Sequence, residues 1–303
     1  MSVPWYRQRW LHLVLGLLVA VLAVFWAGQR ATQGVRDNLD ARLRDAGAGA
    51  DAALVSLEAE QLSALRAVTF TQGVATALAA HDVRILNRLV TPVQANSTVP
   101  MVDVLLPDGR VELAVRSKGA PAPVASRAGL PAIAQSLREA HGQRGGRFSE
   151  VMIFRSGPVL MTIGPVLDQK KGVGVVLVMT PLADALGRLA QQVGVDLTAY
   201  DTAGAPIATT AALDPPAVSR TTAQALIGGG AIVTRTLNDS RREALGRLVV
   251  DHQAVEVLGV SLHDNSDATG QVVTLYAALG LIGTVLILGT FWARVSSRRG
   301  GAA

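Results

Sequence analysis

The sequence contains no cysteine, and aromatic residues make up only 4% of its 303 positions. Without cysteine the chain has no disulfides, no thiolate nucleophile and no cysteine-ligated metal site. Few aromatic rings and a net charge of only +5 argue against a nucleic-acid-binding surface, which needs stacking rings and a dense basic patch. No Gly-x-Ser-x-Gly elbow and no His-Glu-x-x-His pair occurs either. We therefore expect no catalysis in this chain, no cofactor and no nucleic-acid partner.

The histidines are dispersed, and only one group of them offers a conceivable metal site. His252, His263 and Asp264 are near one another in sequence, but His252 is expected in a hairpin turn and His263 at a strand end. We expect no metal ion at these residues.

Charge is almost absent from two long apolar runs. Residues 10–28 read WLHLVLGLLVAVLAVFWAG, and residues 268–293 contain no charged side chain. At about 1.5 Å of rise per residue, each run is long enough as a helix to cross roughly 30 Å of hydrocarbon. We predict two transmembrane helices. A cleavable signal peptide is the alternative for the first run, although Phe25 and Trp26 stand where small residues would favour cleavage.

Arginines flank the outer ends of both runs, and positive charge favours the cytoplasmic side. This pattern predicts a two-pass protein of the bacterial inner membrane, with the lipid bilayer as a partner. The termini, residues 1–9 and 294–303, are then cytoplasmic, and residues 29–267 lie outside. The flanking residues are Arg7, Arg9, Arg294, Arg298 and Arg299.

Residues 29–80 are expected to form a stalk helix and a short helix after it. No proline occurs in this segment, and apolar residues recur at steps of three or four between Val35 and Val68. The apolar side of the stalk can lie on the core of its own chain, or it can pair with a second copy in a parallel homodimer. The two arrangements are compatible.

A phrase occurs twice in the remaining sequence. VDVLLPDGRVELAVR spans residues 102–116 and VDLTAYDTAGAPIATT spans residues 195–210, and each predicts a β-hairpin with a glycine turn. A helical pattern precedes each hairpin, and a second helix and three strand patterns follow it. We predict an α+β fold of two tandem PAS-like modules with antiparallel sheets: a membrane-distal one over residues 81–180 and a membrane-proximal one over residues 181–265.

The crossing between the modules carries a family resemblance. Residues 157–210, GPVLMTIGPVLDQKKGVGVVLVMTPLADALGRLAQQVGVDLTAYDTAGAPIATT, resemble the corresponding stretch of the double Cache domain of bacterial transmembrane receptors. The resemblance implies a sensor whose distal module binds a small molecule and which signals through the second membrane helix. Residues 29–267 contain no tryptophan, so the Arg-x-Trp signature of the amino-acid-binding members is missing and an amino-acid ligand is not implied. No output domain follows residue 293, which implies a longer protein or a separate cytoplasmic signalling partner.

Candidate ligand-binding residues belong to the distal module. Asp103 lies in an apolar strand and needs a partner or a ligand. Arg116 and Arg155 end strands of the same expected sheet and could supply one, while Ser149 and Thr162 offer hydroxyls. An internal salt bridge of Asp103 is the structural alternative. Asp196, interpreted as the repeat of Asp103 in the second module, favours that alternative.

Two functions therefore stay open. The first is a membrane-anchored sensor that binds a small extracytoplasmic ligand in its distal module and passes a conformational change inward. The second is a structural or scaffolding protein of the cell envelope that uses the same modules to contact another protein.

Overall fold

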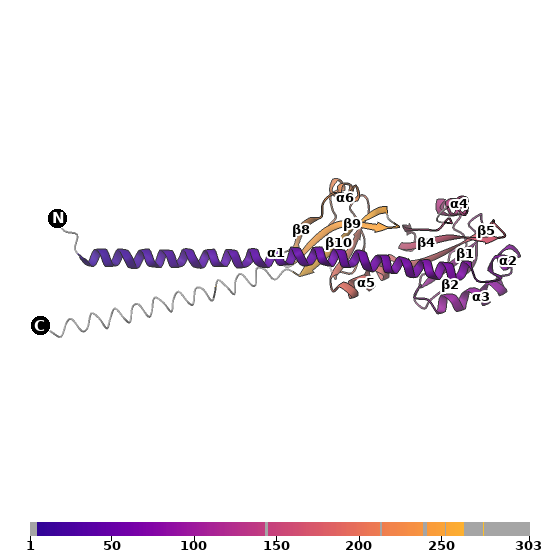
Figure 1. Ribbon diagram of the computed structural model, residues 1–303, viewed down its shortest axis with the longest axis horizontal. Helices are drawn as coiled ribbons and strands as arrows, with labels where there is room; N and C mark the ends of the chain where they lie inside the picture. The colour runs from indigo at the N-terminus through magenta and orange to yellow at the C-terminus, as the bar shows by residue number, and fades with distance from the viewer. Residues whose placement is uncertain are drawn as a thin grey trace. The chain divides into compact units, whose positions relative to one another are not determined.

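The computed structural model describes residues 5–142, 145–212, 214–238, 241–251 and 253–263, together with Leu275 (Figure 1). One compact unit, formed by residues 43–237 and 242–262, contains nearly all of two five-stranded antiparallel sheets. The predicted α+β class with two antiparallel sheets behind a long N-terminal helix is confirmed.

Helix α1, Trp5–Thr69, is longer than the predicted stalk. Its buried side chains follow the predicted spacing through Leu43, Leu54, Leu57, Leu65 and Val68. This stretch therefore lies on the core of its own chain, as the first of the two alternatives required. Pairing with a second copy stays a prediction.

No helix among the described residues combines the length and apolar character needed to cross a membrane. The first predicted span, residues 10–28, lies within α1. The second, residues 268–293, lies outside the described residues except for Leu275. Both spans stay predictions.

The first sheet has the strand order β2-β1-β5-β4-β3. Helix α3 is N-capped by Asp82, whose carboxylate accepts a hydrogen bond from the Ile85 amide at 3.0 Å. The helix buries Leu86, Val90 and Gln94. Helices α2 and α3 pack on one face of the sheet and α4 packs on the other (Figure 1). The elements are α2 (Val74–Ala79), α3 (Val83–Ala95), β1 (Met101–Leu105), β2 (Val111–Arg116), α4 (Pro131–Arg138), β3 (Phe148–Phe154), β4 (Gly157–Asp168) and β5 (Lys171–Pro181).

The second sheet repeats this order as β7-β6-β10-β9-β8. Helix α5 buries Leu182, Ala185, Leu186 and Leu189, the spacing of one helical face, and ends at Gly194 in the left-handed conformation. The elements are α5 (Leu182–Val193), β6 (Asp196–Tyr200), β7 (Pro206–Thr209), α6 (Arg220–Ile227), β8 (Val233–Asn238), β9 (Arg241–Val250) and β10 (Gln253–His263).

The two hairpin turns fix how the modules correspond. The Gly109 amide donates to the Leu106 carbonyl, and the Gly204 amide donates to the Asp201 carbonyl, each at 2.9 Å. Both glycines have a positive φ, +85° and +87°, which other residues adopt at a cost. Gly109 and Gly204 are therefore equivalent positions of the repeat.

The positions of these turns show which residue of the second module is equivalent to Asp103. The structural equivalent of Asp103 is Thr198, whereas Asp196 corresponds to Met101. The interpretation of Asp196 as the repeat of Asp103 is wrong by two residues. Asp103 is thus particular to the first module, and the repeat gives no reason to regard it as shared architecture.

Helix α1 is fastened to the first sheet by a buried glutamine. The Gln61 amide nitrogen donates to the Leu160 carbonyl at 3.3 Å and to the Thr180 hydroxyl at 2.9 Å, and its oxygen accepts from Thr162 at 2.7 Å. Gln61 has no exposed surface. A buried amide of this kind must be fully hydrogen-bonded, so it fixes the register of α1 against β4 and β5.

No linker separates β5 from α5. Pro181 is the last residue of β5 and also the N-cap of α5. The central strand of the first sheet therefore continues directly into the first helix of the second module.

Candidate functional site

Asp103 forms the centre of a buried ion cluster on the α4 side of the first sheet. Its side chain is 0% exposed. One oxygen lies 2.5 Å from Arg116 Nη2, and the other accepts from Arg127 Nε and Nη2, each at 2.9 Å. The Arg127 guanidinium also lies 4.3 Å from the centre of the Phe154 ring. We call Asp103, Arg116, Arg127 and Phe154 the Asp103 cluster.

The Asp103 cluster holds down the loop over residues 117–130. Arg116 donates to the Pro121 carbonyl at 3.2 Å as well as to Val102 and Val115 carbonyls. The Arg127 amide donates to the Gly109 carbonyl at 2.7 Å. Both arginines therefore join the loop to the hairpin β1–β2, together with backbone contacts such as the bond from the Val111 amide to the Ala125 carbonyl.

The Asp103 cluster contains two guanidinium groups and one carboxylate, so it carries an excess positive charge. Arg116 and Arg127 have side chains only 12% and 10% exposed. An unbalanced charge with little solvent around it attracts an anionic group more strongly than an exposed arginine does. The predicted internal salt bridge of Asp103 is present, but the single carboxylate balances only one of the two guanidinium charges.

Ser149 and Thr162 lie on the opposite face, toward α1. Their hydroxyl oxygens are 2.8 Å apart, and Thr162 donates to Gln61. Because the Thr162 hydrogen is engaged with Gln61, Ser149 is the donor to Thr162. The pair thus belongs to a chain of hydrogen bonds from β3 through β4 to α1 and is separated from Asp103 by the sheet.

Arg155 is placed apart from both groups. It lies in the turn between β3 and β4 and is exposed. The structure therefore brings Asp103 together with Arg116, brings Ser149 together with Thr162, and leaves Arg155 outside. Arg127 also belongs to the Asp103 cluster. The sequence did not predict this, because Arg127 lies in a proline- and alanine-rich loop that carries no periodic pattern.

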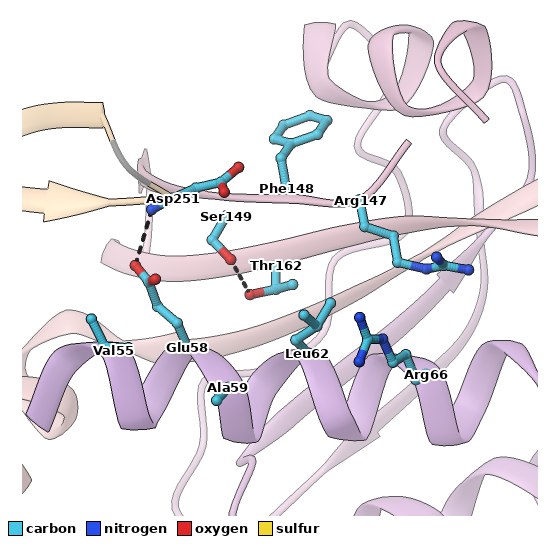
Figure 2. Close-up of a pocket in the computed structure, with 10 residues that line it drawn as sticks. All are labelled: Val55, Glu58, Ala59, Leu62, Arg66, Arg147, Phe148, Ser149, Thr162 and Asp251. Atoms are coloured by element: carbon cyan, nitrogen blue, oxygen red, sulfur yellow. Dashed lines mark hydrogen bonds between the residues drawn. The ribbon is translucent and has the colours of Figure 1, made fainter. Parts of the chain in front are cut away.

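A pocket of about 430 Å³ adjoins Ser149 and Thr162 (Figure 2). Helix α1 forms one wall, and Arg147 and Phe148 at the start of β3 form another. Asp251, in the turn between β9 and β10, closes one end, where its amide donates to Glu58 Oε1 at 3.2 Å. The pocket therefore contacts the first sheet, α1 and a turn of the second module.

The second module has a different buried network. Tyr200 donates to Glu243 at 2.7 Å, and Arg235 Nε donates to the other oxygen of Glu243 at 2.7 Å. Arg235 further donates to the carbonyls of Pro216 and Ala217. Burial, followed by the contact with Glu243, raises the pKa of the Tyr200 hydroxyl well above its ordinary value. Every group here has a partner, which suits a structural role.

Among the described residues, no group of three or more histidine or acidic side chains is placed to hold a metal ion. His252 and Asp264, two of the three residues considered from the sequence, lie outside the described residues. The expectation that no metal ion binds at these three residues stays a prediction.

No protein-family model matches the chain, and no curated protein matches it significantly. Solved structures do match its fold. The ligand-binding domain of the Campylobacter jejuni chemoreceptor Tlp3 in complex with L-valine is 15% identical, with a TM-score of 0.51 over 78% of this chain and 97% of that chain.

Two histidine kinases match in the same way. The sensor domain of the V. cholerae histidine kinase DctB is 10% identical, with a TM-score of 0.51 over 75% of this chain and 97% of that chain. The extracellular domain of the histidine kinase vpHK1S-Z8 is also 10% identical, with a TM-score of 0.51 over 78% and 93%. The chain has the fold of Cache-type sensor domains, as its resemblance implied. These matches are sensor domains rather than catalytic domains.

Proposed function

We propose that the chain is the sensor region of a bacterial transmembrane receptor and that its distal module binds a small molecule. The observation that supports this function is the tandem fold, which matches sensor domains over nearly their whole length. In this proposal the chain has no catalytic activity of its own. Any enzymatic output lies on a further domain or on a cytoplasmic partner.

The proposed arrangement places residues 29–267 outside the cytoplasm, between spans at residues 10–28 and 268–293. Helix α1 leads from the first span to the distal module, residues 81–180. Strand β10 of the proximal module, residues 181–265, ends at His263, shortly before the second span. Both ends of the sensor therefore lead to the membrane, as signalling between two spans requires, and a homodimer through α1 is part of the proposal.

The Asp103 cluster is the proposed ligand site. Its excess positive charge suits a small acid, and Arg127 is its more adaptable member because it belongs to a loop rather than a strand. A ligand carboxylate can bind the guanidinium group of Arg127 while Asp103 stays paired with Arg116. Binding would thus change the loop over residues 117–130, and a ligand shifts a conformational equilibrium only by such differential contacts.

The test is a thermal-shift screen of the full chain, purified in detergent, against small acids, amines and sugars. We expect at least one acid to raise the melting temperature, and we expect Arg127→Met to lose that shift. Arg155→Met is the matched control, since Arg155 is an exposed arginine of the same module. A screen in which no compound of any class binds would count against the sensor and in favour of the scaffold.

A further inference from the structure

The pocket of Figure 2 is separate from the Asp103 cluster. It lies on the α1 side of the first sheet, and none of its lining residues belongs to that cluster. Its volume of about 430 Å³ is within the range of small-molecule sites. The pocket therefore needs its own explanation.

Two arginines meet at one end of the pocket. Arg66 comes from the last turn of α1, and Arg147 immediately precedes β3. In Figure 2 both side chains lie on the side of the view away from Glu58 and Asp251. No ion pair joins either arginine to a carboxylate within the part of the chain that the structure describes. Two like charges from different elements thus lie near enough to interact, and no carboxylate of the described residues pairs with either.

The surroundings of Arg147 make its charge unfavourable. Burial lowers the pKa of its guanidinium, and the charge of Arg66 lowers it further. Its Nε is buried without a hydrogen-bond partner, and its one aromatic contact, with Phe70, leaves that N–H unsatisfied. A buried N–H donor without an acceptor is costly, and an oxyanion would satisfy it.

The rest of the pocket presents hydrogen-bond acceptors. The Ser149 hydrogen is donated to Thr162, so the Ser149 oxygen has lone pairs left to accept. The carboxylates of Glu58 and Asp251 lie at the end away from the arginines (Figure 2). An occupant with a second negative charge would be repelled there, whereas a hydroxyl or ammonium group would be attracted.

We propose that this pocket binds a small organic oxyanion, a carboxylate or a phosphate, between Arg66 and Arg147. The remainder of the molecule carries hydrogen-bond donors that face Glu58 and Asp251. An occupant in this place contacts α1, the first sheet and the β9–β10 turn at once. It therefore fastens α1 to both modules and removes the repulsion between the two arginines. The proposal does not depend on the ligand site at the Asp103 cluster.

Differential scanning fluorimetry of the full chain in detergent, at low ionic strength, tests this site with three probes. Butyrate and inorganic phosphate test the oxyanion, and 4-aminobutyrate adds a donor at the far end. We expect at least one probe at 10 mM to raise the melting temperature by about 3 °C or more, with 4-aminobutyrate exceeding butyrate. Phosphate acting more strongly than both acids would assign the site to phosphorylated compounds.

The variants Arg66→Met and Arg147→Met remove one charge each and keep an apolar chain of similar length. Each variant is expected to lower the affinity for the probe about tenfold or more, because each removes a charge-assisted contact. Arg155→Met, which removes an exposed arginine of the same module, is the control that should keep the full shift. Arg66 is exposed, so Arg66→Met decides the question if Arg147→Met does not fold. Absence of any shift in the unaltered chain, or an equal shift in Arg66→Met, overturns the proposal.

Discussion

Gln61→Met isolates the contribution of the one amide that joins α1 to the first sheet. The change keeps the side-chain length and removes three hydrogen bonds, to Leu160, Thr162 and Thr180. Each such bond contributes about 0.5–1.5 kcal/mol net, and an unsatisfied buried hydroxyl costs about 1–3 kcal/mol. Thr162 keeps Ser149 as a partner, so Thr180 is the hydroxyl left poorly satisfied.

The expected loss of unfolding free energy is therefore about 2–4 kcal/mol. For a domain of this size, each kcal/mol corresponds to roughly 2–4 °C of melting temperature, which gives a decrease of roughly 4–16 °C. Urea unfolding followed by circular dichroism measures the free energy. Gln135→Met is the matched control, because Gln135 lies on the exposed side of α4 and should change stability by no more than about 0.5 kcal/mol.

A second variant makes the reasoning refutable. Adding Thr180→Val to Gln61→Met removes the stranded hydroxyl and should recover part of the lost stability. If Gln61→Met alone is as stable as the unaltered chain, the amide does not fasten α1 to the sheet. If the double change gives only the sum of the two separate losses, the hydroxyl and the amide are not coupled.

Three further predictions concern other buried groups. Gly259→Ala places a methyl group against Glu243 and should cost about 2 kcal/mol or more in urea unfolding, whereas Gly187→Ala, a helix position with open space, should stabilise by up to about 1 kcal/mol. Asp103→Asn leaves two arginines without their carboxylate and should cost about 3–5 kcal/mol, with faster proteolysis of residues 117–130. Burial, and then the charge of Asp201, raises the pKa of Glu256 to about 7, so the folded chain binds a proton there that the unfolded chain has lost. The free energy of unfolding should therefore fall by about 1–3 kcal/mol as the pH rises from 5 to 7. Glu256→Gln should remove this pH dependence.

Each of these has a clear contrary result. Equal stability of the two glycine variants would show that Glu243 moves aside without loss. An Asp103→Asn chain of unchanged stability would mean that the arginines find other acceptors. Glu150 also has a pKa raised by burial, so the comparison is the difference between the unaltered chain and Glu256→Gln, and parallel pH curves would refute the role of Glu256.

The fold could be predicted because its signals are local and repeated. The glycines at residues 109 and 204, the helical spacing of α3 and α5, and the apolar run of β5 each indicate one element. Their order then specifies two similar sheets, since short antiparallel connections leave few alternatives. The two hairpins predicted over residues 102–116 and 195–210 are observed as β1–β2 and β6–β7 for this reason.

The two Val-Asp pairs suggest the wrong correspondence between the hairpins for an equally physical reason. A strand alternates its side chains with a period of two, so a shift of two residues keeps the same faces buried. The Val-Asp pairs at residues 102 and 195 therefore fit the pattern as well as the true register does. The turn hydrogen bonds and the strand bounds distinguish them, and both match Asp103 with Thr198.

The candidate site could be predicted only in part. Asp103 and Arg116 were identifiable because a charge in an apolar strand demands a partner, and the structure pairs them. Arg66 and Arg147 gave no such signal, because an arginine in a last helical turn or just before a strand is ordinary. Their meeting depends on how α1 crosses the sheet, which no local pattern in the sequence specifies.

The absence of a linker at Pro181 joins the central strand of the first sheet directly to the first helix of the second module. Strand β5 occupies the middle of its sheet, where neighbours on both sides prevent it from bending alone. Any sliding or rotation of that strand would act directly on α5, because no residue lies between the end of the strand and the N-cap of the helix. A proline at the joint, whose backbone angle is nearly fixed, stiffens it further. A displacement of β5 in the first module would therefore reach the second module through a single residue, Pro181.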